Sequence, residues 1–262
     1  MNRDPYVELQ GNAADPVLLL HGLGCNGAVW DPLVPLLHKH GFGTIVPDFG
    51  GHGRSAWSPS YSIEQQAAAI AAVVPRGRSV KVIGHSMGAT VGLLLASGRF
   101  GIDVSSLFAV GLKIDWSQEE MDRMGELRPT RLFATRSEAA QRFLRITGLA
   151  GLIDEEHRCV QAGLVEEADG FRLATDPKTV CVVHEPVAPL LARAQASGLP
   201  LRLSCGSEDR LLDIASLRKW DKDAVVFQGY GHNVHVAAQV VLESFLKHGA
   251  ATLSRAGDWR AS

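Results

Sequence analysis

The stretch Val80-Lys81-Val82-Ile83-Gly84-His85-Ser86-Met87-Gly88 decides the fold, because a strand pattern gives way to a helix pattern within it. Its first four residues form a short, mainly apolar run typical of a strand, and the small residues of 87–97 are typical of a helix. Gly84 and Gly88 flank Ser86, each two positions away. Side chains at those positions would collide in a tight strand-to-helix turn. The stretch therefore predicts that Ser86 stands on such a turn, with its hydroxyl lifted clear of the sheet.

The same alternation of short apolar runs and helical segments continues along most of the chain. The predicted strands are 17–20, 44–46, 80–83, 104–110, 201–205 and 224–227. The predicted helices are 31–39, 62–74, 87–97 and 234–247. Wholly apolar runs fit strands that are buried on both faces, as in a parallel sheet. The predicted fold class is therefore α/β, with a mostly parallel central sheet and helices on both faces.

Residues 113–185 interrupt this alternation. They are rich in charged residues, with a surplus of acids, and contain no strand as clear as those on either side. We expect them to form an inserted α-helical cap over the strand ends, which divides the α/β core into 1–112 and 186–262. An independently folding domain is the alternative. Since only 16 residues precede the first core strand, we expect one antiparallel edge strand there or none.

Charge and cysteine content narrow the possible partners. Lysine and arginine number 26 against 28 aspartates and glutamates, which gives a net charge of −2, and there is no basic run for nucleic acid. No apolar run reaches the roughly 18 residues of a membrane span, and no signal-peptide pattern is visible. The 4 cysteines include no C-x-x-C pair, so we expect reduced thiols and no metal or cofactor. We expect a cytoplasmic monomer or homodimer that acts on a small molecule.

The 27 glycines of the 262 residues exceed the usual share of about 7%. Many of them fall in turns just after predicted strands, at positions 22, 24, 50, 51, 53, 84, 88, 206, 229 and 231. Ligand sites of open α/β sheets gather at the carboxyl ends of the strands. The glycine-rich turns therefore predict one site along this edge.

Gly84 to Gly88, together with His21-Gly22-Leu23-Gly24, resembles the α/β-hydrolase superfamily, in its esterase-like and lipase-like subgroup with a serine nucleophile and an inserted helical cap. Three further blocks follow in the family's order. Residues 48–55 resemble the loop after the family's next strand, 206–209 its acid turn and 229–232 its histidine turn. The resemblance covers the chain except for its termini and the inserted middle.

The resemblance implies a catalytic triad of Ser86, Asp209 and His232, in the chain order serine, acid, histidine. An alcohol is a poor nucleophile near neutral pH, so Ser86 needs His232 as a base. His232 in turn needs a carboxylate that fixes its tautomer, which is the role implied for Asp209. Both residues follow predicted strands, and we expect them at the same sheet edge as Ser86.

Other residues compete for these roles. The competing acids are Asp115, Glu208 and Asp213, and the competing base is His235. Asp115 follows the strand 104–110, where some family members carry their acid. The glycine before His232 favours that histidine over His235. We expect His21, His52 and His85 to orient loops rather than to catalyse.

The resemblance also implies an oxyanion hole formed by the backbone N–H groups of Leu23 and Met87, whose side chains are free to shape an acyl pocket. The aromatic residues of the cap are expected either to line this pocket or to pack within the cap; they are Trp116, Phe133, Phe143 and Phe171. Cys25 is expected near the pocket as a small apolar filler rather than a reactive group.

These expectations describe a serine hydrolase that cleaves a carboxylic ester or a related acyl compound through an acyl-enzyme intermediate. Family members that use an aspartate nucleophile, the dehalogenases and epoxide hydrolases, are disfavoured because Ser86 occupies that position. The alternatives are a carbon–carbon bond hydrolase of diketo acids, a lactonase, thioesterase or amidase, and a ligand receptor with slow turnover. His85 argues against the first, since those enzymes often carry asparagine before the serine.

Overall fold

A computed structural model of the protein describes residues 5–11, 16–124, 129–184 and 186–249. A seven-stranded sheet lies at its centre, with the strand order β1-β3-β2-β4-β5-β8-β9. The strands are β1 (Val7–Gln10), β2 (Val17–Leu20), β3 (Thr44–Pro47), β4 (Ser79–His85), β5 (Asp103–Val110), β8 (Leu201–Gly206) and β9 (Val225–Phe227). Only β1 runs antiparallel to its neighbour in this sheet. The predicted fold class is confirmed, and one antiparallel edge strand is present.

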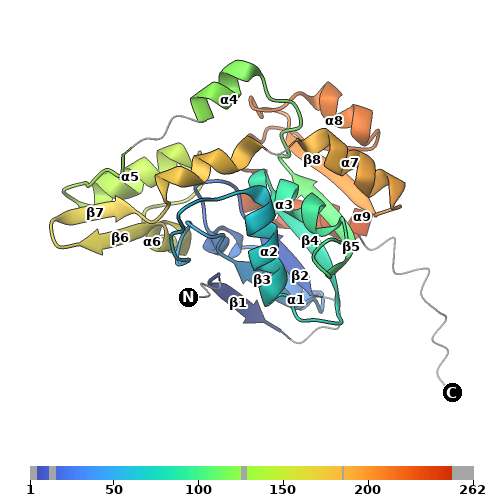
Figure 1. Ribbon diagram of the computed structural model, residues 1–262, viewed down its shortest axis with the longest axis horizontal. Coiled ribbons are helices and arrows are strands. Elements are labelled where there is room, and N and C mark those ends of the chain that lie inside the picture. The colour runs from blue at the N-terminus through green and yellow to red at the C-terminus, as the bar shows by residue number, and fades with distance from the viewer. Residues whose placement is uncertain (1–4, 12–15, 125–128, 185, 250–262) are drawn as a thin grey trace.

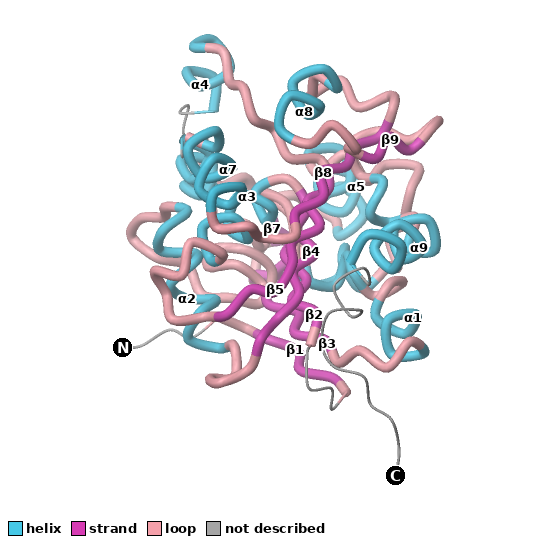
Figure 2. Tube along the Cα trace, turned by 90° about the vertical axis from the view of Figure 1, so that its right-hand side faces the viewer, coloured by secondary structure: helices cyan, strands magenta, loops and turns pink. Residues whose placement is uncertain are grey.

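Helices cover both faces of the sheet, as the edge-on view in Figure 2 shows. One face carries α2 (Ile63–Val73), α3 (Met87–Leu95) and α7 (Val187–Ala196), and the other carries α1 (Val34–Lys39) and α9 (Ala238–Gly249). A further helix, α8 (Ile214–Trp220), lies between β8 and β9 in the chain. No helix within the described ranges combines the length and the apolar character that crossing a membrane requires.

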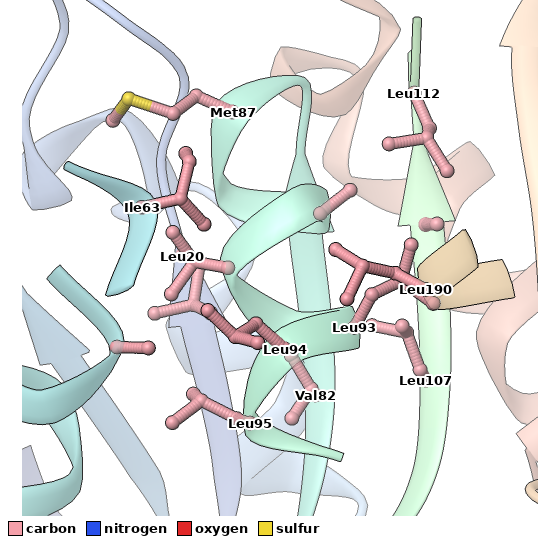
Figure 3. Packing of buried hydrophobic residues seen from close by; sticks show 14 of the residues in the cluster. Leu20, Ile63, Val82, Met87, Leu93, Leu94, Leu95, Leu107, Leu112 and Leu190 are labelled. Atoms are coloured by element: carbon pink, nitrogen blue, oxygen red, sulfur yellow. The ribbon is translucent and has the colours of Figure 1, made fainter. Parts of the chain in front are cut away.

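The central helix α3 is buried along its whole length and packs closely on the sheet. Figure 3 shows Leu93 and Leu94 of this helix among the strand side chains Leu20, Val82 and Leu107, which belong to the same core cluster. Buried apolar area of this kind contributes about 25 cal/mol per Å². This packing fixes the start of α3, and with it the turn at Ser86, against the carboxyl end of the sheet.

Two predicted helices differ in their bounds or continuity from the helices in the structure. The predicted helix 31–39 starts later than expected, because a 3-10 turn at Gly27–Trp30 precedes it and α1 begins only at Val34. In the predicted helix 234–247, a 3-10 turn at Val234–Val236 is separated from α9 by Ala237, whose ψ of 67° is not helical. Hydrophobic spacing does not register such breaks, because a 3-10 turn keeps nearly the same apolar pattern.

The segment between β5 and β8 was expected to be helical, but the structure shows two short strands in it as well. It contains α4 (Gln118–Met124), α5 (Arg136–Ile146), α6 (Arg158–Ala162), the strands β6 (Leu164–Glu167) and β7 (Gly170–Leu173), and a 3-10 helix at Pro177–His184. The two strands pair as an antiparallel hairpin and lie beside α5 and α6 (Figure 1). Their half-buried, charge-containing sequences lack the apolar runs of the central strands.

Candidate active site

Ser86 stands between β4 and α3 in a strained backbone conformation. Its φ of 52° is the one positive value at a non-glycine residue among those described, and its ψ is −116°. Such a conformation costs on the order of 1–3 kcal/mol and persists only where the surroundings impose it. The Ser86 N–H donates to the carbonyl of Val110 on β5 at 2.8 Å, which anchors the turn to the sheet. The predicted strand–turn–helix setting of Ser86 is confirmed.

Gly84 and Gly88 must be glycine because backbone atoms of other residues lie too close to leave room for a side chain. A Cβ on Gly84 would lie 2.6 Å from the carbonyl oxygen of Gly88, and a Cβ on Gly88 would lie 2.3 Å from that of Leu20. These separations are well below van der Waals contact, which for carbon pairs is about 3.5–4.0 Å. The predicted collision is confirmed, and its partner for Gly88 is the end of β2.

Asp209 and His232 meet at the same edge of the sheet. Oδ2 of Asp209 lies 2.8 Å from Nδ1 of His232, while Oδ1 accepts the N–H of Leu211 at 2.9 Å. Asp209 is only 9% exposed. A carboxylate at Nδ1 holds the proton on that nitrogen and leaves Nε2 free to accept one. The pair therefore has the tautomer that a general base requires.

Backbone contacts fix the two turns that carry this pair. The N–H of Glu208 donates to the carbonyl of Tyr230 at 2.9 Å. A Cβ on Gly206 would lie 2.0 Å from the same Tyr230 oxygen, so only glycine allows the two turns to approach. Gly111, which the sequence analysis missed, packs against the imidazole of His232, where a Cβ would lie 3.1 Å from Cε1.

The competing acids are engaged elsewhere or act through their backbone. Asp115 accepts a hydrogen bond from the hydroxyl of Ser216, and Asp213 caps α8 by accepting the N–H of Ala215 at 3.0 Å. Glu208 contributes its backbone N–H to the turn described above.

Among the described residues, no group of three His, Cys, Asp or Glu side chains is arranged to hold a metal ion.

His21 supports the turn that follows β2. The N–H of Phe49 donates to Nε2 of His21 at 2.9 Å, so Nδ1 carries the proton and donates to the carbonyl of Gly22 at 2.8 Å. Burial lowers the pKa of His21 to about 4, which keeps the ring neutral. The predicted supporting role of His21 is confirmed.

The two N–H groups expected to form an oxyanion hole belong to Leu23 and Met87. Among the described residues, neither N–H donates to a backbone carbonyl, so both are available to a ligand.

Three further histidines are buried near this edge and remain uncharged. His85 donates from Nε2 to the carbonyl of His232 at 3.1 Å and stacks on His235 with 3.8 Å between ring centroids. His52 donates from Nδ1 to the carbonyl of Gly50 at 3.1 Å. Burial lowers the pKa of His52 and of His235 to about 3 and that of His85 well below its usual value. His235 is thus a packing partner of His85, as expected from the preference for His232.

A cavity of about 590 Å³ lies in front of Ser86, within the roughly 300–1,000 Å³ of ordinary ligand pockets. Its core lining includes Ser86, His232, Leu23, Met87, Cys25 and His85. The hydrogen bonds among the described residues include none between Ser86 and His232, and such bonds often tighten only when a substrate is present. The cavity thus brings together all the predicted site residues except Asp209, which lies directly behind His232.

The segment 113–185 contributes side chains to the cavity wall that belong to no sequence motif. Trp116 lines the cavity, whereas Phe143 is fully buried and Phe133 is 7% exposed within the packing of the segment. The backbone of Phe171 pairs with that of Phe133. Lining residues that the sequence analysis did not single out are Ile63, Thr90, Lys113, Glu120, Arg145, Ile146, Thr147, Gly148, Val187, Leu211 and Asn233.

The sequence analysis also missed the structural role of Asp48. Its fully buried carboxylate accepts the N–H of Gly27 at 2.7 Å and both the N–H and the Nε–H of Arg54 at 2.8 Å. Burial opposes ionisation of Asp48, but the hydrogen bonds from Arg54 outweigh it and hold the pKa below its usual value. The ion pair joins the loop after β3 to the 3-10 turn after β2. The spacing of Asp48 and Arg54 within one glycine-rich loop was the available signal.

Residues 17–244 match the family model described as the alpha/beta hydrolase family. This chain belongs to the alpha/beta hydrolase family. The match runs from β2 into α9, so it spans the turns of Ser86, Asp209 and His232 and the segment inserted between β5 and β8.

Individual relatives in the alpha/beta hydrolase family are similar over shorter stretches. A lipase, LipV, of Mycobacterium tuberculosis is 35% identical over 99 residues, 37% of each chain. A pimeloyl-[acyl-carrier protein] methyl ester esterase of Methylococcus capsulatus is 35% identical over 88 residues, 34% of this chain and 33% of that protein. The matched segments therefore span about a third of the length of these relatives.

Solved structures of the alpha/beta hydrolase family share the fold over nearly the whole chain. A thioesterase domain from the curacin biosynthetic pathway has a TM-score of 0.75 at 23% identity and covers 92% of this chain and 94% of that one. E-2-(acetamidomethylene)succinate hydrolase has a TM-score of 0.76 at 21% identity, covering 93% and 94%. At these identities the likeness concerns the fold.

Proposed function

We propose that this protein is a serine hydrolase that cleaves a carboxylic ester or a related acyl compound through an acyl-enzyme intermediate. One observation carries the proposal: Ser86, on its strained turn, and the hydrogen-bonded pair Asp209–His232 lie around one cavity. The names of the partial relatives, a lipase and a methyl ester esterase, support an ester as the bond that is cleaved.

In the proposed first half-reaction, Oγ of Ser86 attacks the acyl carbonyl carbon while Nε2 of His232 takes the hydroxyl proton. Asp209 stabilises the imidazolium that forms. The N–H groups of Leu23 and Met87 donate to the oxyanion of the tetrahedral intermediate. The imidazolium then protonates the leaving group as the bond between the carbonyl carbon and that group breaks, which leaves the acyl group on Ser86.

In the second half-reaction, water replaces the leaving group. His232 takes a proton from the water, whose oxygen attacks the acyl carbon, and the same two N–H groups hold the new oxyanion. Collapse of this intermediate breaks the bond to Oγ of Ser86, and the imidazolium returns the proton to that oxygen. The carboxylic acid leaves, and the enzyme is restored.

The segment 113–185 acts in this proposal as a lid that shapes the acyl or leaving-group side of the cavity. Nδ2 of Asn233 donates to the carbonyls of Thr147 and Gly148 at 2.9 and 3.0 Å, which ties the end of α5 to the turn carrying His232. Trp116 adds an aromatic wall. The mainly apolar cavity favours an acyl chain over a strongly polar substrate.

A panel of p-nitrophenyl esters of graded acyl length, joined by lactones, thioesters, amides and diketo acids, tests the proposal. We expect steady turnover of esters by the protein and by Ser58→Ala, which changes an exposed serine, and none by Ser86→Ala. Turnover of diketo acids with no ester hydrolysis would favour the carbon–carbon hydrolase instead. One equivalent of product followed by almost no turnover would indicate a receptor. No hydrolysis of any compound by the folded protein would contradict the proposal.

A further inference from the structure

Two thiols face each other where the turn after β2 meets α6. Sγ of Cys25 lies 3.5 Å from Sγ of Cys159, although the residues are 134 positions apart in the chain. We propose that Cys25 and Cys159 are an oxidation site, at which hydrogen peroxide forms a reversible disulfide that ties the turn after β2 to α6. The disulfide itself does not depend on the proposed function; only its effect on turnover does.

Neighbouring hydrogen bonds hold the two thiols opposite each other. Nδ2 of Asn26 donates to the carbonyl of Cys159 at 2.8 Å. On the other side of Cys25, Oγ1 of Thr175 donates to the carbonyl of Gly24 at 3.0 Å. The turn is therefore attached to the inserted segment both before and after Cys25. A disulfide needs the sulfurs to close to about 2.05 Å, which is a short movement from their present separation.

The two thiols differ in access from the cavity. Cys25 lines the cavity, so a small oxidant can reach it, whereas Cys159 is fully buried behind it. The hydrogen bond to Cys25 and burial together raise the pKa of the Cys159 thiol well above its usual value. Either thiol can donate to the other sulfur across their 3.5 Å separation. Cys25 is the thiol that reacts first, and Cys159 is the one that resolves the product.

The proposed oxidation balances with hydrogen peroxide as its only co-reactant. The Cys25 thiolate attacks one peroxide oxygen, so that an S–O bond forms, the O–O bond breaks and hydroxide leaves. The Cys159 thiol gives its proton to the departing hydroxide. Its sulfur then attacks the Cys25 sulfur, forming the S–S bond and expelling the sulfenic oxygen as hydroxide, which takes up the proton that Cys25 lost on ionising. Two thiols are oxidised, and one peroxide is reduced to two waters.

The disulfide would act on the site because Cys25 lies two residues after Leu23, a proposed oxyanion donor. Drawing Cys25 toward α6 displaces this turn, and misplacement of a catalytic group by about 1 Å can cost on the order of 100-fold in rate. We expect oxidation to lower kcat for ester hydrolysis about 10- to 100-fold and a dithiol reductant to restore it.

Peroxide titration of the protein, followed by alkylation, intact mass measurement and peptide mapping, tests the proposal. We expect the loss of two hydrogens, a peptide that joins Cys25 to Cys159, and full reversal by dithiothreitol. Cys205→Ser should oxidise as the parent does, because Cys205 lies outside the pair. Cys159→Ser should stop at a Cys25 sulfenic acid that dimedone traps.

Several results would overturn the proposal. One is a folded parent protein that forms no disulfide between Cys25 and Cys159 under peroxide; a second is over-oxidation of Cys25 without a disulfide. Equal kcat before and after complete disulfide formation would overturn the proposal that the disulfide displaces the turn after β2 and slows ester hydrolysis. Reduced protein that forms the disulfide but hydrolyses no substrate would refute the proposed function and leave the oxidation site standing.

Discussion

The turns at the carboxyl edge of the sheet and the segment 113–185 both line the cavity, but they are specified in different ways. The edge turns hold their groups through backbone geometry, as shown by the φ of Ser86 and by the approach of Gly206 to the Tyr230 carbonyl. The inserted segment contributes by side chains at scattered positions, such as Trp116 and Arg145. Backbone constraints leave glycine signatures in a sequence, whereas a pocket wall leaves none.

This difference separates the proposed chemistry from the proposed selectivity. Substitutions at the edge turns should change rate or folding, because each group there has one permitted geometry. Substitutions in the inserted segment should change substrate preference, because many side chains can form a wall. Four experiments test whether the edge turns determine rate and folding while the inserted segment determines substrate preference.

The largest effect should follow the loss of the carboxylate behind His232. Asp209→Asn cannot hold the required tautomer, so kcat/KM for an ester should fall about 10³- to 10⁴-fold. The matched change Asp115→Asn affects a carboxylate bonded to Ser216 and should change kcat/KM less than about threefold. Steady-state kinetics on both variants measures the contrast. A comparable loss in both would remove Asp209 from its assigned role.

The next effect concerns the approach of the acid turn to the histidine turn. A methyl group on Gly206 would lie 2.0 Å from the Tyr230 oxygen, whereas one on Gly231 would meet nothing within 4 Å. Gly206→Ala should therefore lower the free energy of unfolding by about 2–4 kcal/mol and Gly231→Ala by less than about 1 kcal/mol. Urea unfolding of the two variants measures the difference. Equal free energies of unfolding in the two variants would show that the acid turn and the histidine turn can move apart without loss of stability.

Acid should destabilise the protein through its buried neutral histidines. The folded-state pKa of His235, about 3, lies below the usual value of about 6.5, so the unfolded chain takes up the proton first. The associated stability is complete above pH 6.5 or so and is lost as the pH falls from there toward the folded-state pKa. His235→Leu should reduce the loss of unfolding free energy between pH 7.5 and 5.0 by about 2 kcal/mol.

Urea unfolding at the two pH values checks this expectation. His38→Leu is a matched control, because His38 lies at the end of α1 beside a hydroxyl group rather than in the histidine stack. An unchanged pH dependence in His235→Leu would contradict the account of this histidine.

The smallest effect belongs to the inserted segment. Trp116→Ala removes an aromatic wall of the cavity, so KM should rise up to about tenfold, or about 1.4 kcal/mol, with kcat nearly unchanged. Leu132→Ala, at an exposed position of the same segment away from the described lining, should leave both constants unchanged. A fall in kcat as large as that of Asp209→Asn would mean that this wall takes part in the chemistry.

The sequence predicted the parts of the molecule whose residues carry backbone constraints. The core strands β2, β3, β4, β5 and β8 have short, mainly apolar sequences. Ser86, Asp209 and His232 each follow a strand in a glycine-containing turn. Gly111 was missed although it serves the same edge, because a lone glycine after β5 has no motif around it. The hairpin β6–β7 was missed because its strands are short and half-buried, with two glutamates at the end of β6 and an arginine within β7.

Contacts between distant segments could not be predicted in the same way. The burial of Phe143 depends on how α5 is turned, which the helical pattern alone leaves open. The position of Trp116 at the cavity depends on the path of the chain between β5 and α4. The meeting of Cys25 with Cys159 depends on where the inserted segment folds back onto the core. Such pairings follow from tertiary packing rather than from local propensity.

Labelling with a fluorophosphonate, followed by peptide mapping, tests the central claim most directly. A serine hydroxyl reacts with this phosphorus centre only when a base activates it and an oxyanion hole receives the developing charge. We predict one covalent adduct per chain, on Ser86, that is absent from Ser86→Ala and much slower to form in Asp209→Asn. A folded protein that stays unlabelled, or that is labelled at another residue, would contradict the account.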